Sequence, residues 1–271
     1  MITEVLLYGE ISFKEGYAFP FTLFIITLIV FGLTLMLIKR NIFIPRIRRL
    51  PAIDAIDEAI GRATEMGRPV HYCIGLGDLV SGYDVPQTIA SLSILRHVAR
   101  RCAEYDTPLI VTFRWPGLQL IATEVVRQAY LEAGKPEKFK PENVIWVTSR
   151  QFAFASGVMG IIQREKPAAS FLLGYFAAES LLIAESGNLI GAIQVAGTAN
   201  SYQIPFFVAA CDYTLISEEL MTAGAYISKD PHQIGTVFSQ DVLRIISIAI
   251  LLIGAILMSF GLKTVVDLIR M

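Results

Sequence analysis

The chain has 271 residues, of which 54% are hydrophobic and 17% are charged. This balance is too apolar for an ordinary soluble domain and too polar for a bundle made only of membrane spans. The net charge of -1 lacks the basic excess that indicates a nucleic-acid partner. The three cysteines, Cys73, Cys102 and Cys211, form no C-x-x-C pair, so we expect reduced, mostly buried thiols and neither a zinc site nor a disulfide framework.

Two apolar runs are long enough to cross a bilayer. The first, residues 19–38, has no charged residue before Lys39 and covers the roughly 20 positions that a hydrocarbon core requires. The second, residues 245–262, lies between Arg244 and Lys263. A basic flank after the first run, without an A-x-A site, favours a retained anchor over a cleaved signal peptide. We therefore expect two transmembrane helices.

Basic residues that follow the first run predict its orientation. The residues before the run contain a single basic residue, Lys14. Those after it are Lys39, Arg40, Arg46, Arg48, Arg49 and Arg62. The positive-inside rule then places both termini outside and the long loop in the cytoplasm. The expected segments are 1–18 outside, the span 19–38, a basic juxtamembrane segment with a linking helix over 39–68, a cytoplasmic domain over 69–240, the span 245–262, and 263–271 outside. We expect Arg46, Arg48 and Arg49 to meet anionic lipid headgroups.

The loop between the spans alternates short apolar runs with longer amphipathic ones. This rhythm is typical of βαβ units around a parallel sheet. The runs expected to form strands are 69–75, 108–113, 143–147, 169–176 and 203–211. The sequence therefore predicts an α/β fold, with a Rossmann-like, doubly wound, mostly parallel sheet of five strands.

Residues 172–198 are nearly as apolar as the spans but contain Glu179 and Glu185. Each carboxylate would cost about 2.5 to 3.5 kcal/mol near the bilayer centre. We therefore expect folded protein around this segment, as domain interior or subunit interface. Its expected local structure is a strand to about Phe176, a helix over 178–185, a break near Gly187, and a small-residue segment over 191–199.

Charged residues are sparse over residues 151–226, which leaves little polar surface to cover the helices of a monomer. Apolar patches larger than a few hundred Å² usually mark a partner. We expect a symmetric homo-oligomer held in one membrane plane. The alternative is that the anchors and the bilayer surface cover the same area.

Ligands of doubly wound sheets bind beyond the carboxyl ends of the strands. The polar residues and glycines that follow the expected strands, and so form the candidate ligand site, are Gly75, Gly77, Asp78, Arg114, Glu179 and Asp212. The turn GLGD does not continue as G-x-G-x-x-G, because Val80 occupies the third glycine position, and no P-loop is present. His71, His97 and His232 have no metal-ligand spacing, and no nucleophile elbow is found. We assign no catalytic residue and no metal, and the cofactor and small-molecule ligand stay unknown.

Three phrases resemble an uncharacterised family of prokaryotic membrane proteins that is catalogued as a domain of unknown function. They are KPAASFLLGYFAAESLLIAESG, GAIQVAGTA and IPFFVAACDYTLISEELMTAGAY, and the resemblance covers most of the loop. It implies membrane anchoring and a bacterial or archaeal source, and thus a location in the prokaryotic cell membrane. It carries no assigned reaction, cofactor or catalytic residue.

The preferred hypothesis is a membrane-anchored, self-associating scaffold or organising protein. The alternative is a membrane-tethered enzyme or small-ligand sensor that uses the cleft at the strand ends, so an enzymatic activity stays open but is not favoured. A third hypothesis is a component of an oligomeric pore or transporter, because two spans per chain line a channel only in an oligomer. The bilayer and a second copy of the chain are the expected partners.

Overall fold

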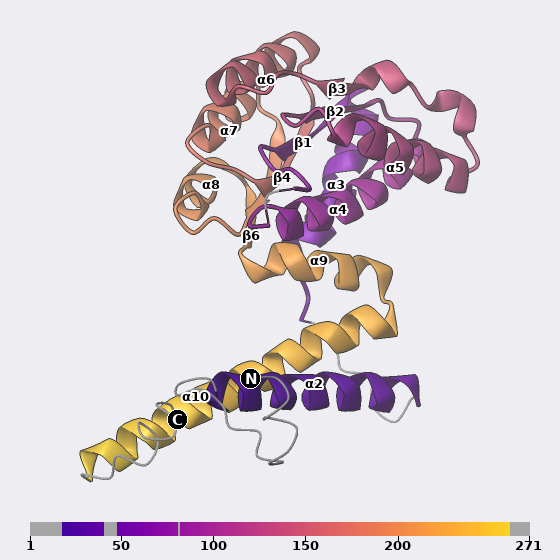
Figure 1. The fold of residues 1–271 in the computed structure, drawn as a ribbon. Helices are drawn as coiled ribbons and strands as arrows, with labels where there is room; N and C mark the ends of the chain where they lie inside the picture. The colour runs from indigo at the N-terminus through magenta and orange to yellow at the C-terminus, as the bar shows by residue number, and fades with distance from the viewer. Residues whose placement is uncertain (1–17, 41–47, 81, 261–271) are drawn as a thin grey trace, which may run out of the picture. The chain divides into compact units, whose positions relative to one another are not determined.

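The computed structural model describes residues 18–40, 48–80 and 82–260 (Figure 1). Helices α2 (Ala18–Lys39) and α10 (Pro231–Ser259) belong to one compact unit, and Arg48–Ser228 form a second. The expected outer segments, apart from Ala18, lie outside the described residues, as do residues 261 and 262 of the second expected span.

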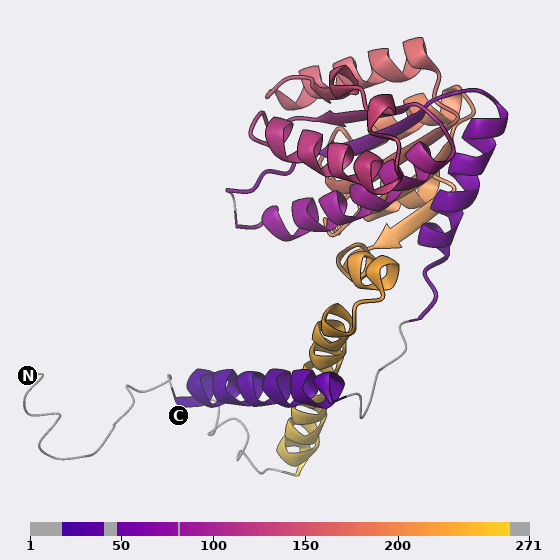
Figure 2. The ribbon, with the colours of Figure 1, turned by 90° about the vertical axis from the view of Figure 1, so that its right-hand side faces the viewer.

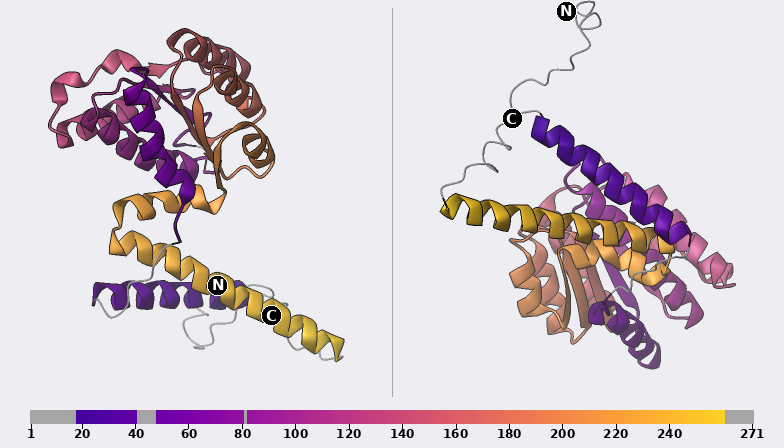
Figure 3. Two further views of the ribbon diagram at one scale, coloured as in Figure 1. Left: turned by 180° about the vertical axis from the view of Figure 1, so that it is seen from behind. Right: turned by 90° about the horizontal axis from the view of Figure 1, so that it is seen from below.

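Among the described residues, α2 and α10 are the two helices that are long and apolar enough to span a membrane. Most of their large side chains are exposed, whereas the core helix of a soluble protein is mostly buried. The two helices pack against each other (Figure 3). At their contact a Cβ atom on Gly235 would lie 2.5 Å from Cδ1 of Ile38, so glycine allows the close approach. Helix α10 begins well before residue 245, the expected start of the second span.

The second unit is built on one parallel sheet, with six strands among the described residues. Its strands lie in the order β3-β2-β1-β4-β5-β6, and every neighbouring pair is parallel. Their bounds are β1 Val70–Gly75, β2 Leu109–Phe113, β3 Val144–Trp146, β4 Ala169–Tyr175, β5 Ile193–Thr198 and β6 Tyr213–Ile216. From β1 the chain adds β2 and β3 on one side of the sheet, and then β4, β5 and β6 on the other side. The boundary between β1 and β4 is the topological switch point, where open α/β sheets place their ligand crevice.

Helices cover both faces of the sheet (Figures 1 and 2). One face carries α3 (Pro51–Glu65), α4 (Val85–Glu104), α5 (Leu118–Glu132) and α9 (Glu218–Ser228), whose buried residues form the larger core. The other carries α6 (Gln151–Glu165), α7 (Ser180–Leu189) and α8 (Ile204–Ala210) over a smaller core. Two 3-10 turns, η1 (Pro136–Lys138) and η2 (Pro141–Asn143), connect α5 to β3. Burial on both faces explains why the central strands read as continuous apolar runs.

Helix α3, expected as a link between span and domain, is part of the α/β unit. Ile53, Ile56 and Ile60 recur at helical spacing and are buried in the larger core. The unit therefore begins before residue 69, at Arg48.

The expectation of five strands is wrong, because the last expected strand is a helix and two strands, β5 and β6, were missed. Residues 204–210 form α8. Pro205 lies in its first turn, where backbone N–H groups have no partner within the helix, so the missing N–H of proline costs nothing there. The fifth strand is Ile193–Thr198, which lies within the small-residue segment over 191–199 that was not among the expected strands. Gly197 is required there, because a Cβ atom would lie 2.9 Å from Cβ of Leu215 on β6.

Residues 172–198 lie inside the α/β unit, as their two carboxylates predicted. They contribute the end of β4, all of α7 and all of β5. The break expected near Gly187 is absent, because α7 continues to Leu189. Gly187 instead lets β5 pack closely, since a Cβ atom there would lie 2.3 Å from Oε1 of Gln194.

Candidate functional site

The candidate site lies at the carboxyl ends of β1 and β4, where two glycines let the strands approach. Gly75 has a φ of +81°, and a Cβ atom there would lie 2.3 Å from the Tyr175 carbonyl oxygen. Gly174 has a φ of +145°, and its Cβ would lie 2.2 Å from the carbonyl oxygen of Ile74. The backbone N–H of Leu76 then donates to the Tyr175 carbonyl at 2.8 Å. The segments that follow β1 and β4 therefore leave the sheet in close contact with each other.

Helix α4 begins beside this crossing and is joined to β5. A Cβ atom on Gly77 would lie 2.3 Å from Oγ1 of Thr88, so the turn after β1 contacts the first turn of α4 directly. The buried amide oxygen of Gln87 accepts from the backbone N–H of Ala199 at 2.8 Å and from the Thr198 hydroxyl at 3.2 Å. Three neighbouring elements, β1, α4 and β5, are held together by these contacts.

Acidic residues occupy the loop between β1 and α4. Asp78 accepts from the backbone N–H of Val80 at 2.8 Å. Burial raises the pKa of Asp84, the negative charge of Asp78 raises it further, and the positive charge of Arg114 opposes both. A phosphate would meet two carboxylates at this helix N-terminus, which weakens the attraction that such a terminus otherwise exerts. The loop therefore favours a neutral or cationic ligand over a polyphosphate.

Arg114 and two tyrosines complete this edge. Arg114 follows β2, and its Nε donates to the carbonyl of Leu76 at 2.9 Å. The rings of Tyr83 and Tyr175 meet edge to face with centroids 5.8 Å apart. Burial raises the pKa of Tyr175, and the charge of Asp84 adds to this effect. The structure thus brings Gly75, Gly77, Asp78 and Arg114 to one edge, as the sequence predicted.

Glu179 also lies at this edge, but it serves the fold. Its side chain is fully buried, accepts from the backbone N–H of Ala177 at 2.9 Å, and accepts from Nε2 of Gln151 at 2.7 Å. It therefore joins the loop after β4 to the first residue of α6. Glu185 is exposed on α7, so the two carboxylates form no pair.

Replacing Glu179 with alanine is expected to destabilise the unit by about 2 kcal/mol, because two half-buried donors lose their buried acceptor at about 1 kcal/mol each. Urea unfolding of the full chain in mild detergent, followed by tryptophan fluorescence, measures this change. Glu185→Ala is the matched control and should stay within about 0.5 kcal/mol of the wild type, since its side chain is exposed. Equal effects of the two substitutions would contradict the structural role of Glu179.

Asp212 lies at the opposite edge of the sheet. We expected it to follow a strand, but it follows α8 and precedes β6. Its carboxylate accepts from the backbone N–H of Gln194 at 2.8 Å, and its own N–H donates to the carbonyl of Gln194 at 3.1 Å. These contacts fix the amino ends of β5 and β6. The structure therefore separates Asp212 from the other candidate residues.

Several buried polar residues of the switch point were missed from the sequence. They are Gln87, Thr88, Ser91, Thr198 and Asn200. The Asn200 side-chain amide donates to the carbonyl of Phe176 at 2.9 Å, and the Ser91 hydroxyl donates to the carbonyl of Leu173. From the sequence alone, such polar residues cannot be distinguished from the solvent-exposed residues of a helix or a turn. Only the Pro86 that precedes Gln87 signalled a helix start here.

Basic residues that were expected at the membrane make contacts within the α/β unit. Arg48 pairs with Glu219, and Arg49 pairs with Asp54 at 3.0 Å. Arg46 lies outside the described residues. Within the part of the chain that the structure describes, no group of three histidine, cysteine or carboxylate residues is placed to hold a metal ion.

No curated protein and no solved structure matches the chain. The family described as "Domain of unknown function (DUF6754)" matches residues 13–269, which include both long apolar helices and the whole α/β unit. The match covers nearly the full chain, and the protein therefore belongs to this family.

Proposed function

We propose that the protein is an integral membrane protein whose Rossmann-like α/β unit self-associates into a homo-oligomeric scaffold. The observation that carries the proposal is a helical face of α6, α7 and α8 that we call the neutral face. Its exposed large apolar residues are Phe152, Leu181, Leu182, Leu189, Phe206 and Val208. Exposed apolar surface gathered on adjacent helices is typical of an interaction site.

The composition of the neutral face decides what kind of partner fits it. No charged residue occurs over residues 186–211, and Glu185 is the single charged residue of α7 and α8. The charged residues of α6 are Arg164 and Glu165 at its end, which pair with each other at 2.8 Å. Such a face offers little to anionic headgroups or to a strongly charged protein. A second apolar, neutral surface of the same kind is its natural complement.

A second copy of this chain supplies that complement. If α2 and α10 span the membrane, all copies share one plane and one orientation, which raises their local concentration. A twofold axis normal to that plane would bring identical faces together, as in most homo-oligomers. The basic residues near α2 favour the cytoplasmic side of a prokaryotic cell membrane for the α/β unit. Arg48 and Arg49 are exposed as well as paired, so headgroup contact belongs to this proposal too.

Ligand binding at the switch point is the second candidate. It is supported by the Asp84 carboxyl, whose pKa is raised chiefly by burial, beside the paired rings of Tyr83 and Tyr175. It has less support than assembly, because Gln87 and Glu179, which are buried there, use their acceptor oxygens on the protein itself. A scaffold requires no free polar group at this edge.

The double variant Leu189→Arg, Val208→Arg is expected to weaken self-association at least about tenfold, because each substitution places an unpaired charge in an apolar contact. Arginine at Leu189 suits the C-terminus of α7, so folding should be kept. Size-exclusion chromatography with light scattering, on the full chain in mild detergent, measures the mass against concentration.

Leu120→Arg is the matched control for this experiment. Leu120 lies on α5, over the other face of the sheet, and is 79% exposed, against 77% for Leu189. It should leave the mass of the oligomer unchanged. A wild-type protein that is monomeric at all concentrations would refute the scaffold and favour cover by the bilayer.

A further inference from the structure

A cavity of about 210 Å³ lies on the opposite edge of the sheet from the switch point. It is partly open to solvent and is lined by the end of α4, by α5, by the starts of β2 and β3, and by the segment of the two 3-10 turns. Its apolar wall is formed by buried side chains, among them Cys102, Leu109, Val126 and Val144. A dry cavity of about 150 Å³ admits benzene, so this one has room for a single substituted ring.

Two polar side chains that line the cavity have no hydrogen-bond partner for their side-chain groups in the described part of the chain. They are the hydroxyl of Tyr130, which is only 6% exposed, and the half-buried amide of Asn143. Burial raises the pKa of Tyr130, and Cys102 and Asp106 add to this effect, so the hydroxyl stays a donor at neutral pH. The Tyr130 oxygen itself reaches solvent in the cavity, where a ligand oxygen would accept from it.

Charge at the cavity favours an anion. Lys138 and Lys140 line it and are exposed, and Asp106 is bound by Lys135 at 2.9 Å. Lys138 lies 3.9 Å from the same carboxylate, so Asp106 is already shared between two ammonium groups. Lys140 forms no ion pair among the described residues. Among the residues that line the cavity, the two ammonium groups of Lys138 and Lys140 are opposed by the single carboxylate of Asp106, which leaves a net charge of +1.

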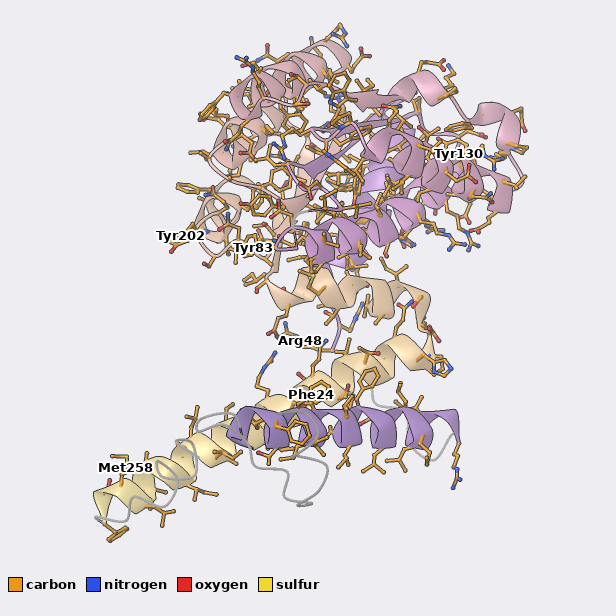
Figure 4. All side chains as sticks on the ribbon, viewed as in Figure 1. Phe24, Arg48, Tyr83, Tyr130, Tyr202 and Met258 are labelled. Carbon is orange, nitrogen blue, oxygen red and sulfur yellow. The ribbon has the colours of Figure 1, made fainter. Side chains whose placement is uncertain are left out.

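We propose that this cavity binds a small aromatic carboxylate, with its ring against Val126 and Phe139. The carboxylate accepts from the Tyr130 hydroxyl and the Asn143 amide, and lies near the ammonium group of Lys140. The ring centroids of Phe139 and Tyr130 lie 6.1 Å apart with the ring planes inclined at 60°, and both residues line the cavity. Tyr130 is on α5, on the far side of the unit from Tyr202 (Figure 4).

The test uses 4-fluorobenzoate as the probe and fluorine NMR line broadening as the readout, with the full chain in detergent and empty micelles as the blank. We expect saturable binding with a Kd on the order of 1 mM or tighter, as a ligand of this size allows. The neutral analogue 4-fluorobenzyl alcohol and the cation 4-fluorobenzylamine should bind at least about fivefold more weakly.

Variants locate the site. Tyr130→Phe removes one oxygen that has no described protein partner, so it should preserve folding and weaken the benzoate at least about fivefold. Val126→Phe fills the cavity and should abolish binding. Tyr202→Phe, at an exposed tyrosine, should change nothing. Absence of saturable binding, equal binding of the amine, or wild-type affinity in Tyr130→Phe would each overturn the proposal, even if Val126→Phe fails to fold.

Discussion

Gly174→Ala is expected to destabilise the α/β unit by more than about 3 kcal/mol, enough to prevent folding in a protein of ordinary stability. Two effects add at this position. The φ of +145° lies in a region that side chains rarely adopt, and the new Cβ would lie 2.2 Å from the carbonyl oxygen of Ile74. That oxygen belongs to the backbone of β1, so it cannot move aside as a flexible side chain would. The central strand pair would have to separate.

Urea unfolding of the full chain in mild detergent measures the loss. Both tryptophans, Trp115 and Trp146, lie in the α/β unit, so their fluorescence reports on that unit. Gly160→Ala is the matched control, because Gly160 is exposed in the middle of α6 and has open space around it. That substitution should stabilise by about 0.5 to 1 kcal/mol, since alanine favours a helix interior. A loss below 1 kcal/mol for Gly174→Ala would contradict the close crossing of β1 and β4.

The long periodic elements could be predicted from the sequence because their signals are local. The linking helix expected within residues 39–68 is found as α3, and β1, β2 and β4 lie where continuous apolar runs were found. The last third of the sheet could not be predicted in this way. Residues 193–198 include the β-branched Ile193, Val195 and Thr198, but the run is short and is interrupted by alanine and glycine. The strand fits there because Gly197 permits contact with both Leu173 and Leu215. That requirement is set by neighbours distant in sequence.

The candidate site shows the same division. Gly75, Gly77 and Arg114 were placed correctly, because the ends of their strands were clear. Asp212 was misplaced by the error over α8, which moved it from one edge of the sheet to the other. The cavity beside Tyr130 gave no motif at all, because its lining residues come from six separate elements. Such a site can be found only in the folded structure, where these distant residues come together.

Histidine in a buried strand predicts an acid-sensitive fold. His71 lies in the middle of β1 and is 1% exposed, with Nδ1 3.0 Å from the Ser170 hydroxyl and Nε2 2.9 Å from that of Thr112. These hydroxyls satisfy the ring but carry no charge to compensate an imidazolium. Burial alone lowers the pKa of His71 to about 3, from about 6.5 in an unfolded chain.

The sign of the pH effect follows from which state binds the proton. Below pH 6.5 the unfolded chain protonates His71, whereas the folded protein resists protonation until the pH is near 3. The stabilising contribution is therefore complete above pH 6.5 and declines by about 1.4 kcal/mol per unit as the pH falls. At pH 4.5 the loss from this one residue is about 3 kcal/mol.

His71→Gln tests this assignment, because an amide can bond to both hydroxyls without titrating. Unfolding free energies at pH 7 and pH 4.5 should differ by about 3 kcal/mol less in this variant than in the wild type. Carboxylates such as Asp57 also contribute acid sensitivity. Burial raises the pKa of Asp57, but His97 and Arg101 together lower it by more, so the net shift is downward. Their contribution is common to both proteins and cancels in the comparison. His232→Gln, at an exposed position, should keep the wild-type pH dependence, and equal behaviour of the two variants would show that His71 is protonated in the folded state.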